Sequence, residues 1–320
     1  MQASRRQVVL GGLGSLGSAA LGSQLMGCAS LPTAPKPESV TVPHSTGTDT
    51  PVFAMPALAC DCHHHIYDRR YPAHPSATLL PEDASMADYK LLQKRLGLQR
   101  NVIVQPSTYG VDNRLLVDTL KVMGSGARGV AVVDVNVSDE QLLALHQAGV
   151  RGIRFNLSFL VGITTDMMLP LSKRIAAIGW HIQINGSADR ILAQQALISS
   201  LEVPVVFDHM GQLPQPQGTD HPVFKVYERW LGEGKTWFKL SGPYLTSKKT
   251  DLSDAVGVAQ ALIARAPDRM VWGSDWPHPT KKANEKPNDA AILNLLAAWA
   301  TTEAARAKIL VHNPAKLYGF

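Results

Sequence analysis

Short runs rich in β-branched residues alternate eight times with longer amphipathic runs between residues 57 and 298 of this 320-residue chain. Strand, helix and strand in steady succession predict a parallel sheet, because two parallel strands need a crossover connection. Eight such units over about 260 residues fit a closed barrel, typically about 250 residues long, better than an open sheet. The sequence therefore predicts an α/β protein whose fold is a (β/α)8 TIM-type barrel.

The expected strands are Ala57–His65, Asn101–Gln105, Gly129–Asp134, Gly152–Asn156, His181–Asn185, Val203–His209, Thr236–Ser241 and Met270–Asp275. The expected helices are Ser85–Leu96, Asp112–Met123, Ser138–Ala148, Met168–Ile178, Ala188–Ser199, His221–Leu231, Asp251–Ala264 and Asp289–Ala298.

Residues 1–28 predict an export signal rather than part of the fold. Arg5 and Arg6 precede a Gly-rich, weakly apolar stretch, as in a twin-arginine signal peptide. The segment from Leu25 to Cys28 also resembles a lipobox, in which Cys28 would carry a lipid anchor; the alternative is a disordered tail. These features predict a periplasmic protein, a membrane-anchored lipoprotein if Cys28 is modified, with the twin-arginine export machinery as a partner.

The rest of the chain divides into a tether and a domain. Residues 29–54 are rich in Pro, Ser and Thr and show little apolar periodicity, which is typical of a tether, so the barrel is expected over residues 55–320. The chain has 31 Lys and Arg against 26 Asp and Glu, a net charge of +5, or 29 − 26 = +3 without Arg5 and Arg6. This weak charge gives no support for a nucleic-acid partner, and three cysteines exclude a small disulfide scaffold.

Polar side chains gather at the ends of the expected strands, where a barrel of this kind carries its active site. They are His63, His65, Gln105, Asp134, Asn136, Arg154, Asn156, Asn185, His209, Lys239, Ser241, Asp275 and His278. Ordinary loop starts would account for Asp134, Asn136 or Ser241. They do not account for three imidazoles, a guanidinium and a carboxylate at one rim, so we predict an active site there.

The first expected strand contains the run from Cys60 to His65. Because side chains alternate across a strand, Asp61, His63 and His65 are expected to share the barrel face. Cys60, Cys62 and His64 are then expected to face the helices, with both cysteines as free thiols.

Three of these motifs resemble the signatures of the amidohydrolase superfamily. They are Asp61-x-His63-x-His65, Phe207-Asp208-His209-Met210-Gly211 and Trp272-Gly273-Ser274-Asp275-Trp276-Pro277-His278. Further segments, from Gln105 to Asn113, Arg151 to Asn156, Lys239 to Tyr244 and Asn313 to Gly319, are similar to the branch that contains 2-pyrone-4,6-dicarboxylate lactonase and 4-sulfomuconolactone hydrolase. The resemblance covers Met55 to Phe320.

The resemblance implies a hydrolase that opens a small anionic lactone in the catabolism of aromatic compounds. Asp275 would activate water as the general base, while the imidazoles of His63, His65 and His209 would donate to the carbonyl oxygen. A second group would bind the substrate: Arg154, Asn156, Gln105, Tyr109, Lys239, Tyr244 and His278. Arg154 suits a carboxylate, because its guanidinium is a planar and permanently charged fork.

Two positions differ from what a dicarboxylate enzyme implies. Gln212 and Leu245 stand where further arginines are expected, so the substrate should carry less, or differently placed, negative charge. A muconolactone or a sugar lactone is then as plausible as the pyrone itself. Two long loops, Ile66–Ala84 and Trp276–Pro287, are expected to act as lids over the site.

We predict catalysis without a metal, although His63, His65 and Asp275 form an alternative zinc site. The resemblance implies that metal-dependent relatives add a His or a carboxylated Lys near the fourth or fifth strand. Here the fifth strand offers Gln183 and Asn185, and His181 lies at its beginning. Two other functions stay open: a zinc-dependent hydrolase or decarboxylase of the same fold, and a periplasmic protein that binds a ligand without catalysis.

Overall fold

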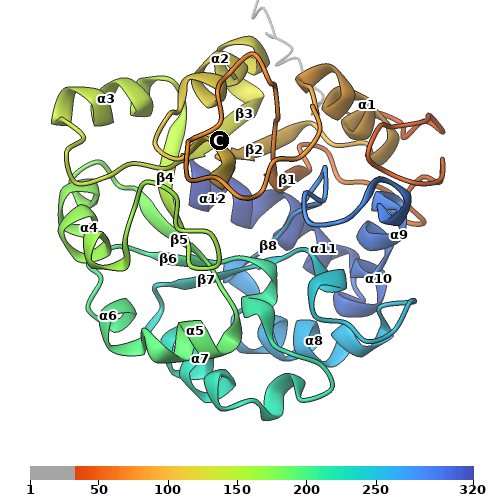
Figure 1. Cartoon of the computed structure of the whole chain (residues 1–320). Coiled ribbons are helices and arrows are strands. Elements are labelled where there is room, and N and C mark those ends of the chain that lie inside the picture. Colours follow the sequence, from red (N-terminus) through yellow and green to blue (C-terminus); the bar gives the residue numbers. More distant parts are fainter. Residues whose placement is uncertain (1–32) are drawn as a thin grey trace, which may run out of the picture. The chain divides into compact units, whose positions relative to one another are not determined.

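The computed structural model describes residues 33–320, so the export signal and the lipobox lie outside the described residues. Eight strands form one parallel sheet in the order β1 to β8, with the helices around it (Figure 1). The strands are β1 (Cys60–His64), β2 (Arg100–Val104), β3 (Ala127–Ala131), β4 (Val150–Asn156), β5 (His181–Asn185), β6 (Val205–Phe207), β7 (Thr236–Leu240) and β8 (Met270–Trp272).

Backbone hydrogen bonds beyond the strand ends join the first strand to the last. The amide of Asp275 donates to the carbonyl of His63 at 2.8 Å, and that of His65 donates to the carbonyl of Trp276 at 2.8 Å. The predicted (β/α)8 barrel is therefore confirmed.

The helices are α1 (Met86–Leu96), α2 (Arg114–Met123), α3 (Asp139–Gln147), α4 (Met168–Ala176), α5 (Ala188–Ala193), α6 (Gln195–Ser199), α7 (Pro222–Glu233), α8 (Val256–Arg265), α9 (Asp289–Asn294), α10 (Leu296–Trp299), α11 (Glu303–Ala307) and α12 (Asn313–Tyr318). Capping boxes begin two of them, with Ser85 at α1 and Ser138 at α3. The expected helix 188–199 is divided between α5 and α6. Within residues 33–320, no helix is long and apolar enough to span a membrane.

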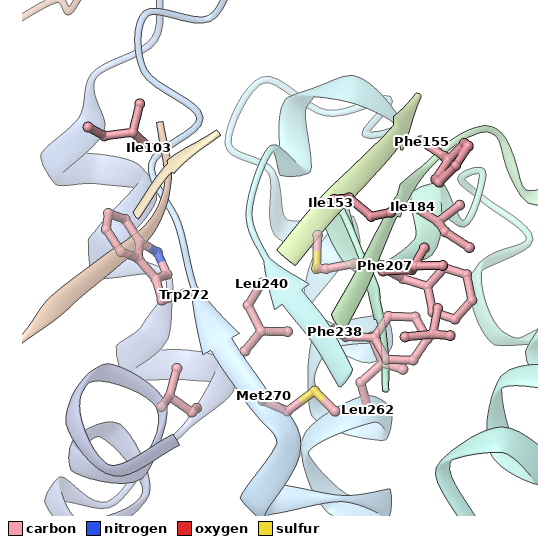
Figure 2. Close-up of a cluster of buried hydrophobic side chains, with 14 of the residues drawn as sticks. Ile103, Ile153, Phe155, Ile184, Phe207, Phe238, Leu240, Leu262, Met270 and Trp272 are labelled. Atoms are coloured by element: carbon pink, nitrogen blue, oxygen red, sulfur yellow. The ribbon is translucent and has the colours of Figure 1, made fainter. Parts of the chain in front are cut away.

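Alternate strand residues belong to two separate apolar clusters. The outward side chains, including Ile103, Phe155, Ile184 and Phe207, belong to the large cluster between the sheet and the helices. Figure 2 shows part of this cluster, with Leu262 of α8 among its residues. The inward side chains form the smaller cluster of Cys60, Cys62, Val102, Val104, Val130, Val206, Trp237, Val271 and Tyr318. Because Tyr318 comes from α12, the C-terminal helix closes the barrel beneath the site.

The predicted orientation of Cys60 and Cys62 was wrong, because both side chains lie in the inward cluster instead of facing the helices. Both residues are free thiols, as predicted. Asp61 faces α1, where the Tyr89 hydroxyl donates to its carboxylate at 3.1 Å. A bulge explains how His63 nevertheless faces inward: from Asp61 to His64 the first strand advances three residues while its partner strand advances two. This extra residue reverses the alternation of side chains beyond it. His64 therefore faces the helices, where its ring stacks on that of Tyr89 with 3.5 Å between ring centroids.

The segment 33–54, which was expected to be a tether, packs against the barrel, and the compact unit begins at Thr33 rather than at residue 55. We call residues 33–54 the N-terminal strap. Its Val42 is only 2% exposed, and its Pro43 carbonyl accepts a hydrogen bond of 2.8 Å from the indole of Trp276. Arg95 of α1 donates to the Gly47 carbonyl at 2.8 Å. The Pro-rich composition of this segment therefore marks an extended layer rather than a free linker.

Candidate active site

All four of the predicted catalytic side chains meet at the C-terminal end of the barrel. The Oδ1 atom of Asp275 lies 3.5 Å from His63 Nε2, 3.7 Å from His65 Nε2 and 3.9 Å from His209 Nε2. All four residues are buried, with Asp275 4% exposed. Three strand ends, β1, β6 and β8, thus place three imidazoles around one carboxylate.

Backbone conformation at the strand ends is unusual. His209 and Asp275 have left-handed φ values of 52° and 63°, which cost a residue with a side chain roughly 1–3 kcal/mol. Two glycines make room for the imidazoles: a Cβ on Gly242 would lie 2.7 Å from His209 Nδ1, and one on Gly273 would lie 2.5 Å from His63 Cβ. Strain and close packing of this kind are typical of a site whose geometry is maintained for function.

Asp208 is a site residue that the sequence analysis missed. Its carboxylate lies 3.2 Å from His63 Nδ1, accepts from Arg154 Nε at 3.2 Å and lies 3.8 Å from Lys239 Nζ. Although burial opposes ionisation, His63, Lys239 and Arg154 hold the pKa of Asp208 well below its ordinary value. The alternation of side chains along the strand could have identified it. Asp208 is two residues beyond Val206, which faces inward, so Asp208 is expected to face inward as well.

Lys239 lies beneath the imidazoles rather than at the rim. It is fully buried, and its Nζ donates to Gln183 Oε1 at 2.6 Å and lies 3.4 Å from His63 Nδ1. Burial lowers the pKa of Lys239 to about 8, so the ammonium remains mostly charged at neutral pH. Its position suits support of His63 rather than direct contact with substrate.

The hydrogen bonds determine what each imidazole can do. His65 Nδ1 is 2.8 Å from the Val104 carbonyl, which only accepts, so Nδ1 carries the proton and Nε2 of the neutral ring is an acceptor. His209 Nδ1 is 3.0 Å from the Ser241 hydroxyl, which can donate to it and leave a proton on Nε2. In the neutral form of the His65 ring, Nε2 therefore accepts a hydrogen bond, whereas the expected role requires it to donate one.

Burial also sets the charges at this centre. It lowers the pKa values of His63 and His209, so both rings are neutral near pH 7. Burial alone would raise the pKa of Asp275, but the surrounding imidazoles lower it by a larger amount. The pKa is therefore below its ordinary value, and the carboxylate is ionised. The centre thus combines an ionised base with the neutral rings of His63 and His209.

A cavity of about 190 Å³ opens above these residues. Its lining includes Arg154, Asn156, Asn185, His209 and Asp275, and both long loops contribute to it, through Tyr67 and Leu79 and through Pro279 and Thr280. Such a volume suits a small ligand, since pockets that bind drug-sized molecules have volumes of about 300–1,000 Å³. A larger groove of about 730 Å³ lies between α2 and α3, but it contains none of the rim imidazoles.

Besides the buried Lys239, four of the predicted substrate-binding residues do not line this cavity. Gln105 follows the inward Val104, so it points outward and donates to the Asp112 carbonyl at 2.7 Å. The Tyr109 hydroxyl accepts from the Asp68 amide at 2.8 Å and so fixes the first loop. Tyr244 and His278 lie behind Asp275: the Tyr244 hydroxyl donates to its Oδ2, and His278 Nδ1 is 3.0 Å from that hydroxyl. These residues are placed to hold loops and the base rather than the substrate.

The donor atoms of His63, His65 and Asp275 fit a divalent metal. Four-coordinate zinc has bonds of about 2.0–2.1 Å, so its ligand atoms are about 3.3 Å apart. The two Nε2 atoms lie 3.2 Å apart, and they are 3.5 and 3.7 Å from Asp275 Oδ1. When His63 Nδ1 donates to Asp208, both Nε2 atoms carry lone pairs, as metal ligation requires.

Comparison with known proteins finds relatives over most of the chain. A family model described as Amidohydrolase matches residues 60–320. The chain is 36% identical over 282 residues to the 2-pyrone-4,6-dicarboxylate hydrolase of Comamonas testosteroni, covering 84% of this chain and 92% of that protein. It is 31% identical over 274 residues to the 4-sulfomuconolactone hydrolase of Rhizobium radiobacter, covering 83% and 92%.

Solved structures show the same fold. An apo structure from Agrobacterium tumefaciens matches with a TM-score of 0.80 at 28% identity, covering 87% of this chain and 98% of that one. An amidohydrolase of Burkholderia multivorans with bound zinc matches with a TM-score of 0.64 at 18% identity, covering 82% and 100%. The second likeness concerns the fold alone.

Proposed function

Since this chain belongs to the amidohydrolase family, we propose that it is an enzyme that hydrolyses the cyclic ester of a small anionic lactone. Its curated relatives act on a pyrone dicarboxylate and on a sulfomuconolactone, which supports this reaction class. A substrate of either type would place the enzyme in the breakdown of aromatic compounds, whereas a sugar lactone would not. The proposal rests chiefly on one observation, the ionised Asp275 surrounded by three imidazoles beside Arg154.

In the proposed reaction, Asp275 removes a proton from a water molecule as its oxygen attacks the lactone carbonyl carbon. The developing oxyanion accepts hydrogen bonds from the Nε2–H groups of His209 and His63. For His63 this requires the tautomer that is protonated at Nε2, whose Nδ1 accepts a hydrogen bond from Lys239. The ring C–O bond then breaks, and the leaving oxygen takes the proton held by Asp275. The products are a hydroxyl and a second carboxylate, and one proton is released to the solvent.

The variant Asp275→Asn tests this assignment, because it keeps the size of the side chain but removes the base. We expect turnover to fall by about 10²-fold or more, with little change in affinity, in an assay of proton release from lactones. Arg154→Met should chiefly raise KM, because it removes a charge that holds the substrate. Near-normal turnover of the Asp275 variant would contradict the proposal, whereas saturable binding without turnover by the parent would indicate a ligand-binding protein.

A zinc-dependent hydrolase or decarboxylase is the second candidate, and the spacing of His63, His65 and Asp275 supports it. Zinc held there would act as a Lewis acid or lower the pKa of a water molecule. We nevertheless propose metal-free catalysis, because the inward residues of β5 near the site are Gln183 and Asn185, which are poor zinc ligands. Activity should then survive prolonged chelation. Loss of activity on chelation, and its return with stoichiometric zinc, would establish the second candidate.

A further inference from the structure

Three arginines lie at the end of the barrel opposite the candidate active site. Arg100 is the first residue of β2, Arg128 is the second of β3 and Arg151 is the second of β4, and these strands are neighbours in the sheet (Figure 1). The guanidinium carbons of Arg100 and Arg128 lie 5.1 and 4.7 Å from the centroid of the Phe320 ring. Lys121 lies in the last turn of α2, at the same end of the barrel. We call Arg100, Lys121, Arg128 and Arg151 the basic face.

A cavity of about 460 Å³ opens on the basic face between the C-terminal ends of α2 and α3. Lys121, Arg128 and Arg151 line it, and none of the described residues that line it is an Asp or a Glu. The ion pairs among residues 33–320 include none of the four cations of the basic face. Burial and the charges of Arg151 and Arg100 lower the pKa of Arg128, but a guanidinium stays charged. Positive charge is therefore concentrated here, and no side chain of the described residues neutralises it.

Backbone carbonyls hold the arginines of the cavity in place. Arg128 donates to two carbonyls at the end of α12, at 3.2 and 2.7 Å. Arg151 donates through Nη1 to the carbonyls of His146 and Val150 at 2.9 and 2.7 Å. Its Nη2 and Nε, like the ammonium group of Lys121, have no hydrogen-bond partner within residues 33–320. These donors suit an anion with several oxygens, such as a phosphate group.

The N-terminal strap begins at the same end of the barrel. Because α1 joins the C-terminal end of β1 to the start of β2, it ends on the side opposite the mouth. There a Cβ on Gly97 would lie 3.0 Å from Pro37 Cγ and 3.2 Å from the Pro35 carbonyl oxygen. Cys28, the proposed site of lipid attachment, precedes Thr33 by 33 − 28 = 5 residues, which span at most about 18 Å. Lipid at Cys28 would therefore keep this end of the barrel close to the membrane.

We propose that the basic face binds the surface of an anionic phospholipid membrane, with lipid phosphates in the cavity beside Lys121 and Arg151. The candidate active site lies at the other end of the barrel, so its mouth would face the solvent and dissolved substrate. A few cations bind such a surface weakly, and salt screens the attraction. The basic face therefore orients the barrel, whereas lipid at Cys28 retains it. This inference does not depend on the proposed lactone hydrolysis.

Vesicle sedimentation with the full chain carrying Cys28→Ala tests the proposal without any attached lipid. The vesicles are phosphatidylcholine, either pure or mixed with phosphatidylglycerol at three to one. At low salt, we expect the partition coefficient to be about 10-fold higher or more on the anionic vesicles, and to fall as sodium chloride is added. Equal binding to the two kinds of vesicle would overturn the proposal. So would displacement by inorganic phosphate at unchanged ionic strength, because it would indicate a site for the free anion instead of a membrane surface.

Matched variants separate the basic face from the net charge of the protein. Lys121→Glu reverses an exposed charge of this face and should lower binding to the anionic vesicles by about 10-fold. Lys225→Glu makes the same change of net charge on the first turn of α7, at the mouth end, and should have little effect. Arg151→Gln, compared with Lys282→Gln in the loop after β8, is a second pair, and all four proteins keep the same residues 1–32. Equal losses in each variant and its control would contradict the assigned face.

Hydrogen exchange of the vesicle-bound chain tests the orientation. Amides in the loops 97–99 and 124–126 should exchange more slowly on anionic vesicles, because lipid headgroups cover that end of the barrel. Amides in the loops 66–84 and 276–287, at the mouth, should exchange as in the free protein. Protection confined to the mouth loops, or equal protection of all four loops, would overturn the proposed orientation.

Discussion

Asp275 is held from behind by a line of buried side chains. Tyr244 donates to its Oδ2, His278 Nδ1 lies 3.0 Å from the Tyr244 hydroxyl, and Asp289 Oδ2 lies 3.2 Å from His278 Nε2. Asp289 is fully buried, and Arg95 lies 3.9 Å from it. This line occupies one carboxylate oxygen of Asp275, so that the other oxygen faces the imidazoles.

Asp289 is therefore expected to act as a positioning residue. Asp289→Asn should lower kcat by about 10-fold with little change in KM, since it weakens the support of the base without touching the cavity. Steady-state kinetics at a temperature where the variant is folded measures this split. Asp268→Asn removes a surface carboxylate paired with Lys308 and is the matched control. A variant that loses stability but keeps the parent kcat would show that Asp289 has only a structural role.

His181 at the barrel bottom should limit stability in acid. Its ring packs edge-on against Tyr318, and burial lowers its pKa to about 3. An unfolded histidine has a pKa of about 6.5, so the unfolded state binds more protons below that pH and stability falls as the pH drops from 6.5 towards 3. This histidine alone should cost about 2 kcal/mol between pH 7 and pH 5.

His181→Gln removes the titrating group from this position. In urea unfolding at the two pH values, the variant should lose about 2 kcal/mol less than the parent, whatever its stability at pH 7. Equal losses in the two proteins would contradict the assigned role of His181.

Residue types and strand ends were enough to predict the rim imidazoles, Arg154 and Asp275. Their hydrogen-bond partners were not predictable, because a partner depends on which side of the strand each residue faces. Gln105 has a suitable side chain but points outward, whereas Asp208 was overlooked although it points inward. Counting alternate residues from an inward apolar residue of the same strand would have predicted the orientations of both Gln105 and Asp208 correctly.

At the level of elements, the bulge in β1 shows what alternation alone cannot predict. The motif Asp61-x-His63-x-His65 favours one face for all three residues, but the extra residue puts Asp61 on the helix side. There its carboxylate accepts from the Ser274 amide at 3.0 Å and from the Ser274 hydroxyl at 2.6 Å, which ties β1 to the segment after β8. The insertion therefore separates a structural carboxylate from the imidazoles of the site.

The N-terminal strap is a second element that composition alone described wrongly. Its contacts with α1, with the loop after β8 and with α9 predict a contribution to stability. A chain that lacks residues 1–54 should unfold at a temperature lower by several degrees than one that lacks residues 1–32, because it exposes Trp276 and leaves the buried Arg95 with fewer partners. Thermal unfolding of the two truncated proteins measures the difference. Equal unfolding temperatures of the two proteins would contradict this prediction and would support the interpretation of residues 33–54 as a tether.

For the whole molecule, we propose that Arg5 and Arg6 direct export to the periplasm. The pair precedes an apolar run, and it lies outside the described residues. The double variant Arg5→Lys and Arg6→Lys keeps the charge, so a machinery that recognises the arginines themselves should leave it in the cytoplasm. Cell fractionation with an activity assay measures the outcome. Normal periplasmic recovery of the double variant would exclude this route.

Cys28 provides a separate test of how the exported chain is retained. In this proposal, the exported chain associates with the membrane through lipid attached at Cys28, the last residue of the lipobox-like segment. One acyl chain binds membranes only marginally, whereas two or more give stable anchoring. Cys28→Ala should therefore move the exported protein from the membrane fraction to the soluble fraction without changing its specific activity, since the barrel begins beyond this residue. A parent protein found in the soluble fraction, or a variant that stays with the membrane, would contradict the lipid anchor.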